Sequence, residues 1–75
     1  MSRVLITGAN GFAGPYVAAA LAERGHQIVG VSHAAVNIAG GPVERWLVAD
    51  LADPVQAREA VEMARPDMVV HLAAI

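Results

Sequence analysis

Three glycines at a fixed spacing are the residues of this chain whose type and position could do chemistry. Gly8, Gly11 and Gly14 stand three residues apart, between a run rich in β-branched residues and an alanine-rich run. Backbone without a side chain can approach a ligand closely and can adopt a positive φ. A helix that begins at such a turn presents unpaired N–H groups and a partial positive charge, which favour a phosphate. The spacing therefore predicts a phosphate-binding turn.

Each glycine has its own expected task. We expect Gly8 to make the tight turn, Gly11 to let the backbone approach a pyrophosphate, and Gly14 to let the helix pack closely. The alternative is that the three glycines serve turns and packing alone. A nucleoside triphosphate P-loop is excluded, because that motif needs a lysine and the chain has none.

The rest of the sequence predicts strands that alternate with helices around this turn. The expected strands are residues 3–7, 27–32, 44–49 and 68–72, and the expected helices are residues 12–24 and the segment between Asp53 and Pro66. Apolar strands joined by helices indicate a parallel sheet covered on both faces. Right-handed crossovers then give an α/β, doubly wound half-sheet with strand order 3-2-1-4.

Local signals support the two helices. Gly25 is typical of the position that follows a helix C-cap. Asp53 can cap the second helix, Pro54 fits its first position, and Gln56 stands where the glutamine of a capping box would. The faces expected to pack on the sheet are those of Ala13, Val17, Ala20 and Leu21 in the first helix and Ala57, Ala60, Val61 and Ala64 in the second.

The composition limits what 75 residues can form. Hydrophobic residues make up 56% of the chain and charged residues 16%, although so small a domain keeps much of its surface exposed. An unusually apolar small domain is one explanation. We expect instead that residues 1–75 are the N-terminal portion of a larger domain, because the apolar run at residues 67–75 ends without polar residues.

Charge and residue usage exclude several classes of partner and site. The net charge is −2 and no basic cluster occurs, which argues against nucleic acid and against an anionic membrane. Cysteine is absent, and His26, His33 and His71 are too scattered for a metal site. A signal peptide is the alternative at the N-terminus, but glycines and Asn10 interrupt its apolar stretch, so we expect a cytoplasmic protein.

The glycine spacing also points to a family. "TGANGFAG" (residues 7–14) resembles the T-G-x-x-G-x-x-G motif of the short-chain dehydrogenase/reductase superfamily, above all its extended branch of nucleotide-sugar epimerases, dehydratases and reductases. "VADLAD" (residues 48–53) and "VVHLAA" (residues 69–74) resemble the third-strand and fourth-strand motifs of that branch. The resemblance covers essentially the whole chain and implies a Rossmann-type domain that binds NAD(P).

The resemblance also assigns cofactor contacts. They come from the backbone of Asn10, Gly11, Phe12 and Ala13 at the pyrophosphate and adenosine ribose, from Asp50 at the adenine amino group with Leu51 beside it, and from Leu72, Ala73 and Ala74 along the nicotinamide-side ribose. Plainer roles remain open for three residues. Asp50 could be an ordinary loop carboxylate, Phe12 could belong to the core, and His71 is expected to be structural rather than catalytic.

The end of the second predicted strand bears on the choice of cofactor. An NAD-selective site carries an acidic residue there, about 20 residues after the glycines, but this chain has Ser32 and His33. A carboxylate would repel a 2′-phosphate by about 4 kcal/mol at 4 Å and an effective dielectric of 20, so its absence permits NADP. A neutral His33 adds a hydrogen bond and little charge. We expect NADP(H), with NAD(H) as the alternative.

The chemistry of the family needs residues that this sequence does not contain. A Tyr-x-x-x-Lys pair with a Ser or Thr serves the reaction there, whereas this chain has no lysine and only Tyr16, within the first predicted helix. Two hypotheses follow: the cofactor-binding part of an enzyme that acts on a nucleotide sugar, or an inactive member that binds the dinucleotide as a sensor or structural ligand. The resemblance also implies a homodimer for the full-length protein.

Overall fold

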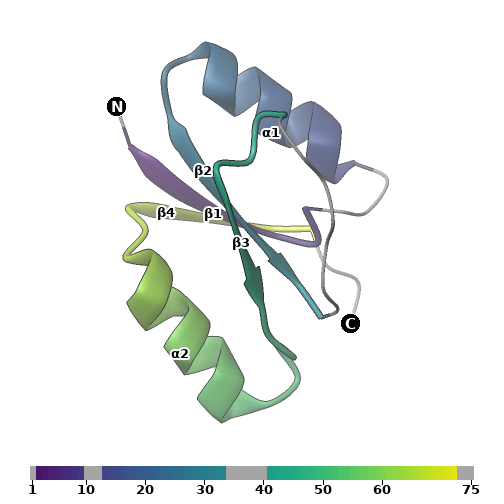
Figure 1. Cartoon of the computed structure of the whole chain (residues 1–75), viewed down its shortest axis with the longest axis vertical. Coiled ribbons are helices and arrows are strands. Elements are labelled where there is room, and N and C mark those ends of the chain that lie inside the picture. The colour runs from purple at the N-terminus through teal and green to yellow at the C-terminus, as the bar shows by residue number, and fades with distance from the viewer. Residues whose placement is uncertain (1, 10–12, 34–40, 73–75) are drawn as a thin grey trace.

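The protein forms a four-stranded parallel sheet with one helix on each face (Figure 1). The computed structural model describes residues 2–9, 13–33 and 41–72. The elements follow one another as β1 (Arg3–Thr7), α1 (Gly14–Glu23), β2 (Gln27–Ser32), β3 (Arg45–Val48), α2 (Pro54–Ala64) and β4 (Met68–His71). Within these ranges, no helix combines the length and the apolar character needed to cross a membrane.

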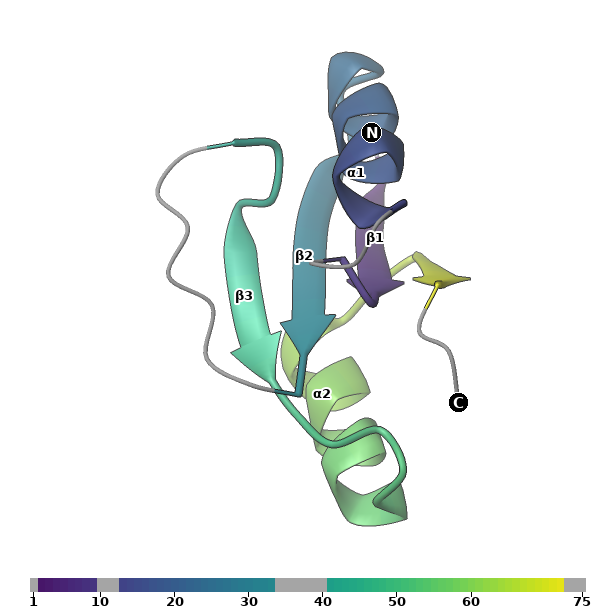
Figure 2. The same ribbon diagram turned by 90° about the vertical axis from the view of Figure 1, so that its right-hand side faces the viewer.

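The strands lie in the order β3-β2-β1-β4, which Figure 2 shows across the sheet and which confirms the predicted topology. Thr7, the last residue of β1, pairs with Val31 of β2 on one side and with His71 of β4 on the other. All pairs are parallel, so the carboxyl ends of the four strands meet at one edge. The order reverses between β1 and β4, and a doubly wound sheet binds its ligand at such a switch point.

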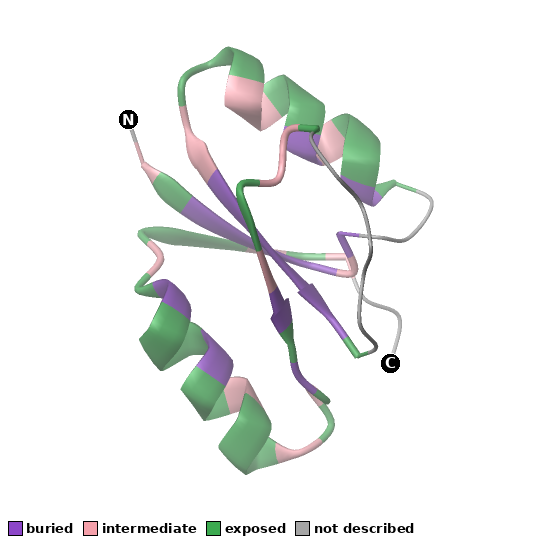
Figure 3. Ribbon diagram, in the orientation of Figure 1, coloured by how far each residue is buried: buried purple, intermediate pink, exposed green. Residues whose placement is uncertain are grey.

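Two hydrophobic clusters hold the helices to the sheet (Figure 3). Alternate residues of a strand point to opposite faces. Val4 and Ile6 of β1 therefore pack with Ala18 of α1, while Leu5 packs with Ala60 and Ala64 of α2. The prediction that the two helices cover opposite faces is confirmed.

Helix α1 begins two residues later than predicted, and only part of its predicted face, Val17 and Leu21, packs against the sheet. Gly14 and Ala18 are its buried residues, whereas Ala13 and Ala20 of the expected face are exposed. The helix ends at Glu23, and Gly25 follows with φ +86° as predicted. Gly14 is buried because it lies directly against the Ala9 backbone of the preceding turn.

Helix α2 has the predicted ends and only part of the predicted face. Ala60 and Ala64 are buried, whereas Val61 keeps 46% of its surface exposed. Arg65 follows in the left-handed region with φ +48°, and Pro66 prevents the helix from continuing. The strands β3 and β4 are shorter than predicted, because Glu44, Ala49 and Leu72 lie outside the paired residues.

Gly14 is the glycine whose lack of a side chain matters most for packing. A Cβ on Gly14 would collide with the backbone carbonyl of Ala9, and backbone cannot swing away as a flexible side chain can. Gly25 gives a matched contrast, because its positive φ is strained for other residues while nothing lies within 4 Å of a Cβ there. The two glycines therefore separate a steric requirement from a conformational one.

We expect Gly14→Ala to cost about 3 kcal/mol of unfolding free energy, as overpacking against a rigid neighbour does. Gly25→Ala should cost only about 1 kcal/mol, the penalty for a side chain at positive φ. Denaturant unfolding of both variants beside the unsubstituted protein measures the difference. Equal costs would contradict the steric role of Gly14.

Candidate functional site

The carboxyl edge of the sheet brings most of the predicted site residues together. The segments that leave the four strands there begin with Gly8 after β1, His33 after β2, Ala49 and Asp50 after β3, and Leu72 after β4. The arginines Arg3 and Arg45 begin their strands and lie at the opposite edge. The Arg3 guanidinium donates a hydrogen bond to the Ala64 carbonyl at the end of α2 (3.2 Å), as expected for a residue far from the site.

The turn between β1 and α1 is built around Ala9. Gly8 has φ +69°, the left-handed conformation that a tight turn requires, and Ala9 behind it is 2% exposed. Gly14 lies directly against the Ala9 backbone, so α1 starts immediately beside the turn. The predicted contacts Asn10, Gly11 and Phe12 lie outside the described residues, and Ala13 is exposed.

Among the described residues, no side chain caps the N-terminus of α1. Its N-cap residue, Ala13, supplies no side-chain hydrogen bond, Pro15 stands in the first turn, and no acidic residue lies in that turn. The orphan N–H groups of a first turn need a partner, and the helix dipole favours an anion there. In α2 the Asp53 carboxylate takes that place by accepting from the Val55 N–H (2.9 Å). In the part of the chain that the structure describes, α2 therefore has a side-chain cap and α1 has none.

Gly30 in the middle of β2 supports the same turn and was missed by the sequence reasoning. A Cβ on Gly30 would lie 2.7 Å from the ring of Trp46 and 3.1 Å from the Cβ of Ala9. Ala9 therefore packs onto a strand position that has no side chain, and Trp46 closes the same space from β3. A glycine inside a predicted strand often marks a place where another part of the backbone approaches closely, so the sequence did contain a signal for this contact.

Asp50 is held by three hydrogen bonds in the turn from β3 to α2. Its backbone N–H donates to Oε1 of Gln56 (2.7 Å), and its carbonyl accepts from the Asp53 N–H (3.0 Å). Its Oδ1 accepts from the Ala52 N–H (3.0 Å). The residue is exposed at the carboxyl edge. Asp50 thus presents a positioned carboxylate there, and the partly buried Leu51 packs against the α2-side cluster.

The Gln56 side chain does not bind the backbone N–H that a capping box predicts. A capping box would place the Gln56 side chain on the Asp53 backbone N–H, but that N–H already donates to the Asp50 carbonyl. Gln56 therefore reaches further back and binds Asp50, while its Nε2 donates to Oδ2 of Asp53 (3.3 Å). The glutamine links the helix cap to the residue predicted to meet adenine.

The ends of β1 and β4 are joined through the Thr7 side chain. Thr7 is 4% exposed, and its Oγ1 lies 2.8 Å from Nδ1 of His71. The Leu72 N–H donates to both the carbonyl and the Oγ1 of Thr7, at 3.1 Å each. Predicted contacts Ala73 and Ala74 lie outside the described residues. His71 thus has a side-chain hydrogen-bond partner, as a structural histidine should.

Ser32 and His33, the residues predicted to bear on the choice of cofactor, lie at the carboxyl end of β2. Ser32 is buried and His33 is exposed at the edge. The Ser32 carbonyl accepts from the Ala49 N–H (2.9 Å), so Asp50 follows β3 beside the end of β2. The Asp50 carboxylate is drawn toward its own turn by Ala52. Residues 27–33 contain no carboxylate.

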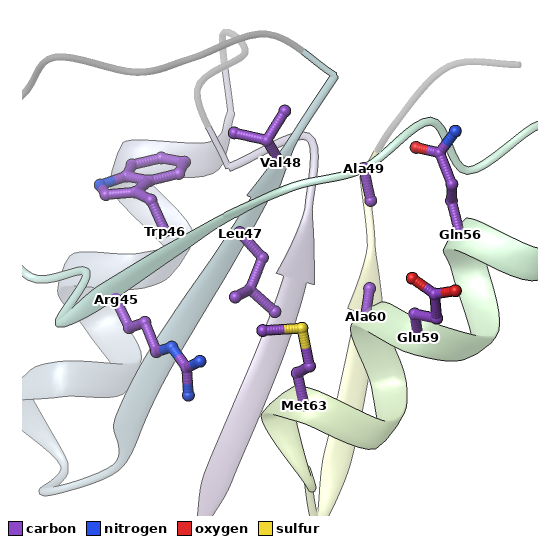
Figure 4. A pocket seen from close by; sticks show the side chains of 9 residues that line it. All are labelled: Arg45, Trp46, Leu47, Val48, Ala49, Gln56, Glu59, Ala60 and Met63. Atoms are coloured by element: carbon purple, nitrogen blue, oxygen red, sulfur yellow. The ribbon is translucent and has the colours of Figure 1, made fainter.

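A hollow of about 450 Å³ lies elsewhere, between β3 and α2 (Figure 4). Leu47 points from β3 toward Met63 of α2, whereas Trp46 leaves the strand on the opposite side. Gln56, Glu59 and the buried Ala60 complete the α2 wall. The hollow is therefore on the α2 face, and the glycine turn is not among its walls.

The sequence of this chain is similar to those of known proteins. Residues 4–75 match the model of the family described as "NAD dependent epimerase/dehydratase family". A protein of Sinorhizobium fredii named as a probable dTDP-glucose 4,6-dehydratase is 39% identical over an alignment of 80 residues that covers 96% of this chain and 23% of that protein.

Solved structures show the same fold at similar identity. The enzyme WbmH of Bordetella bronchiseptica, in complex with NAD+, is 32% identical with a TM-score of 0.79, covering 100% of this chain and 26% of that one. The UDP-glucose 4-epimerase of Thermus thermophilus, in complex with NAD, is 30% identical with a TM-score of 0.80, covering 97% and 24%. The chain spans about a quarter of the length of these relatives.

Removing the α2 cap tests the assignment of Asp53. Asp53→Ala should lower the unfolding free energy by about 1 kcal/mol, because the Val55 N–H loses its partner. Asp53→Asn is the matched control, since an asparagine oxygen caps about as well. Denaturant unfolding of both variants measures the effect, and an equal loss for Asn and Ala would contradict capping by the side-chain oxygen.

Proposed function

The chain belongs to the NAD dependent epimerase/dehydratase family, and from that premise we propose that it is the dinucleotide-binding part of an enzyme acting on a nucleotide sugar. The bound nicotinamide supplies the chemistry by accepting and returning a hydride. The residues of this chain bind and orient the cofactor. Gly8 and Gly14 shape the turn, and the start of α1 receives the pyrophosphate.

The N-terminus of α1, which no described side chain caps, is the observation that carries the proposal. It lies beside a turn shaped by glycine, next to the point where the strand order reverses. A pyrophosphate is negatively charged and is therefore attracted to the partial positive charge of the helix N-terminus. Glycines let it approach the backbone because they carry no side chain. The N-cap position of α2 is instead occupied by Asp53, whose carboxylate already binds the first turn of that helix.

We further propose that the sheet continues beyond β4 and that the catalytic residues lie elsewhere in the full-length protein. Among the described residues β4 pairs on one side only, and its Met68 and Val69 keep 46% and 52% of their surface exposed. Apolar residues of this kind suit a further strand or helix packed against them. Tyr16 lies on α1 with 74% of its surface exposed and no lysine accompanies it, so we place proton transfer in the remaining part.

Activity is tested on the full-length protein with a panel of nucleotide sugars. We expect the cofactor to bind and at least one sugar nucleotide to change the absorbance of the nicotinamide or yield an altered sugar. Tight cofactor binding with no turnover on any sugar would support the alternative, an inactive sensor or structural member. Failure to bind either dinucleotide would reject both.

For the cofactor we propose NADP(H) in preference to NAD(H). His33 is exposed at the end of β2, and Ser32 precedes it where an NAD-selective site has an acid. The Asp50 carboxylate beside them is turned toward Ala52. A 2′-phosphate at this position therefore meets possible hydrogen-bond donors rather than a carboxylate from β2. The NAD complexes of the relatives make NAD(H) the competing outcome.

Dissociation constants for NADPH and NADH test this choice. We expect NADPH to bind more tightly, and His33→Asp to weaken NADPH by about tenfold or more through repulsion of the 2′-phosphate. NADH should change much less, because its ribose carries a hydroxyl there. His33→Asn is the matched uncharged control. A smaller dissociation constant for NADH in the unsubstituted protein would overturn the preference.

The proposed contact between Asp50 and the adenine amino group has its own test. A carboxylate accepts from an amino group but is repelled by the oxygen that replaces it in hypoxanthine. We expect the protein to bind the adenine dinucleotide more tightly than its hypoxanthine analogue, by about tenfold. Asp50→Asn should remove most of that difference. An unchanged ratio in Asp50→Asn would leave Asp50 as an ordinary loop carboxylate.

A further inference from the structure

His71 has a position that a merely structural histidine does not need. It is the last residue of β4 and pairs with Thr7, the last residue of β1, immediately before Gly8. The strand order reverses between these two strands, so a dinucleotide bound at the edge has to cross from one to the other. The His71 residue is exposed although its partner Thr7 is buried.

The hydrogen bonds around Thr7 form a clamp between the two strand ends. Oγ1 of Thr7 meets Nδ1 of His71 at 2.8 Å and also accepts from the Leu72 N–H at 3.1 Å. The carbonyl of Thr7 accepts from the same N–H at 3.1 Å. Leu72 is thereby tied to Thr7 through its own N–H. The imidazole of His71 adds a further link between the end of β4 and Thr7.

We propose that His71 is a positioning residue for the nicotinamide half of the dinucleotide. It acts through Thr7 by holding the end of β4 at a set distance from the glycine turn. This inference rests on the proposed dinucleotide site and adds a residue to it. It assigns His71 no proton transfer and no direct contact with the reacting atoms.

The topology explains why only one half of the cofactor depends on this clamp. The turn after β1 and the ends of β2 and β3 lie on one side of the switch point, and these supply the proposed sites for pyrophosphate and adenosine. β4 alone lies on the other side within the described sheet. Loosening β4 should therefore weaken the binding of a ligand that extends over it, and should spare ADP.

The test compares two ligands on the full-length protein. We expect His71→Ala to weaken binding of the preferred dinucleotide by about fivefold to tenfold, the effect of one lost hydrogen bond, while ADP changes less than about twofold. His71→Asn should restore most of the dinucleotide affinity, because its amide occupies the position of Nδ1. A role in stability alone would not shift the ratio of the two affinities.

His26 supplies a matched control. Its Nδ1 accepts from the Ser2 N–H (3.1 Å), so His26→Ala removes a similar hydrogen bond just before β2, at the opposite edge of the sheet. We expect that variant to leave both affinities unchanged. Thr7→Val combined with His71→Ala should weaken dinucleotide binding no more than Thr7→Val alone. Thr7→Val already removes the hydrogen bond to His71, together with the one from Leu72.

The outcomes separate the inference from the function on which it rests. If neither the dinucleotide nor ADP binds the unsubstituted protein, the proposed function is wrong and the inference falls with it. If both bind and His71→Ala weakens them equally, or weakens neither, the inference alone is wrong. Additive losses in the double variant would also overturn the action through Thr7.

Discussion

The close approach of Ala9 to two glycines is the constraint on which the rest of this structure depends. Gly14 admits the Ala9 backbone on one side, and Gly30 admits its side chain on the other. Any residue larger than glycine at either position would displace the turn or Trp46. This packing seats α1 against the sheet and brings the helix N-terminus to the edge where the strands end.

The two helices of the fold show how one motif serves different ends. Both follow a strand at the same edge and both have proline in the first turn. In α2 the Asp53 carboxylate binds the Val55 N–H and Gln56 binds the Asp50 N–H. The first turn of this helix therefore has an anionic partner within the protein. In α1 the N-cap is an alanine, which provides no side-chain hydrogen bond.

Local sequence signals predicted much of this arrangement because they act over a few residues. Asp53 caps α2, Gly25 follows α1, and the alternation of strands and helices gave the strand order. The errors arose where another contact a few residues away replaced the expected one. Gln56 binds Asp50 because Asp53 had already used its N–H, and Gly14 of α1 is buried directly against the Ala9 backbone.

The sequence by itself determined the fold class, the family and the place of the glycine turn, since glycine spacing and strand composition are local properties of the chain. Only the tertiary structure decided what supports that turn. The contact of Gly30 with Trp46 and the hydrogen bond of Thr7 with His71 join residues 16 and 64 positions apart. Such pairs form because parallel strands are joined by long crossovers, and no local pattern records which side chains then meet.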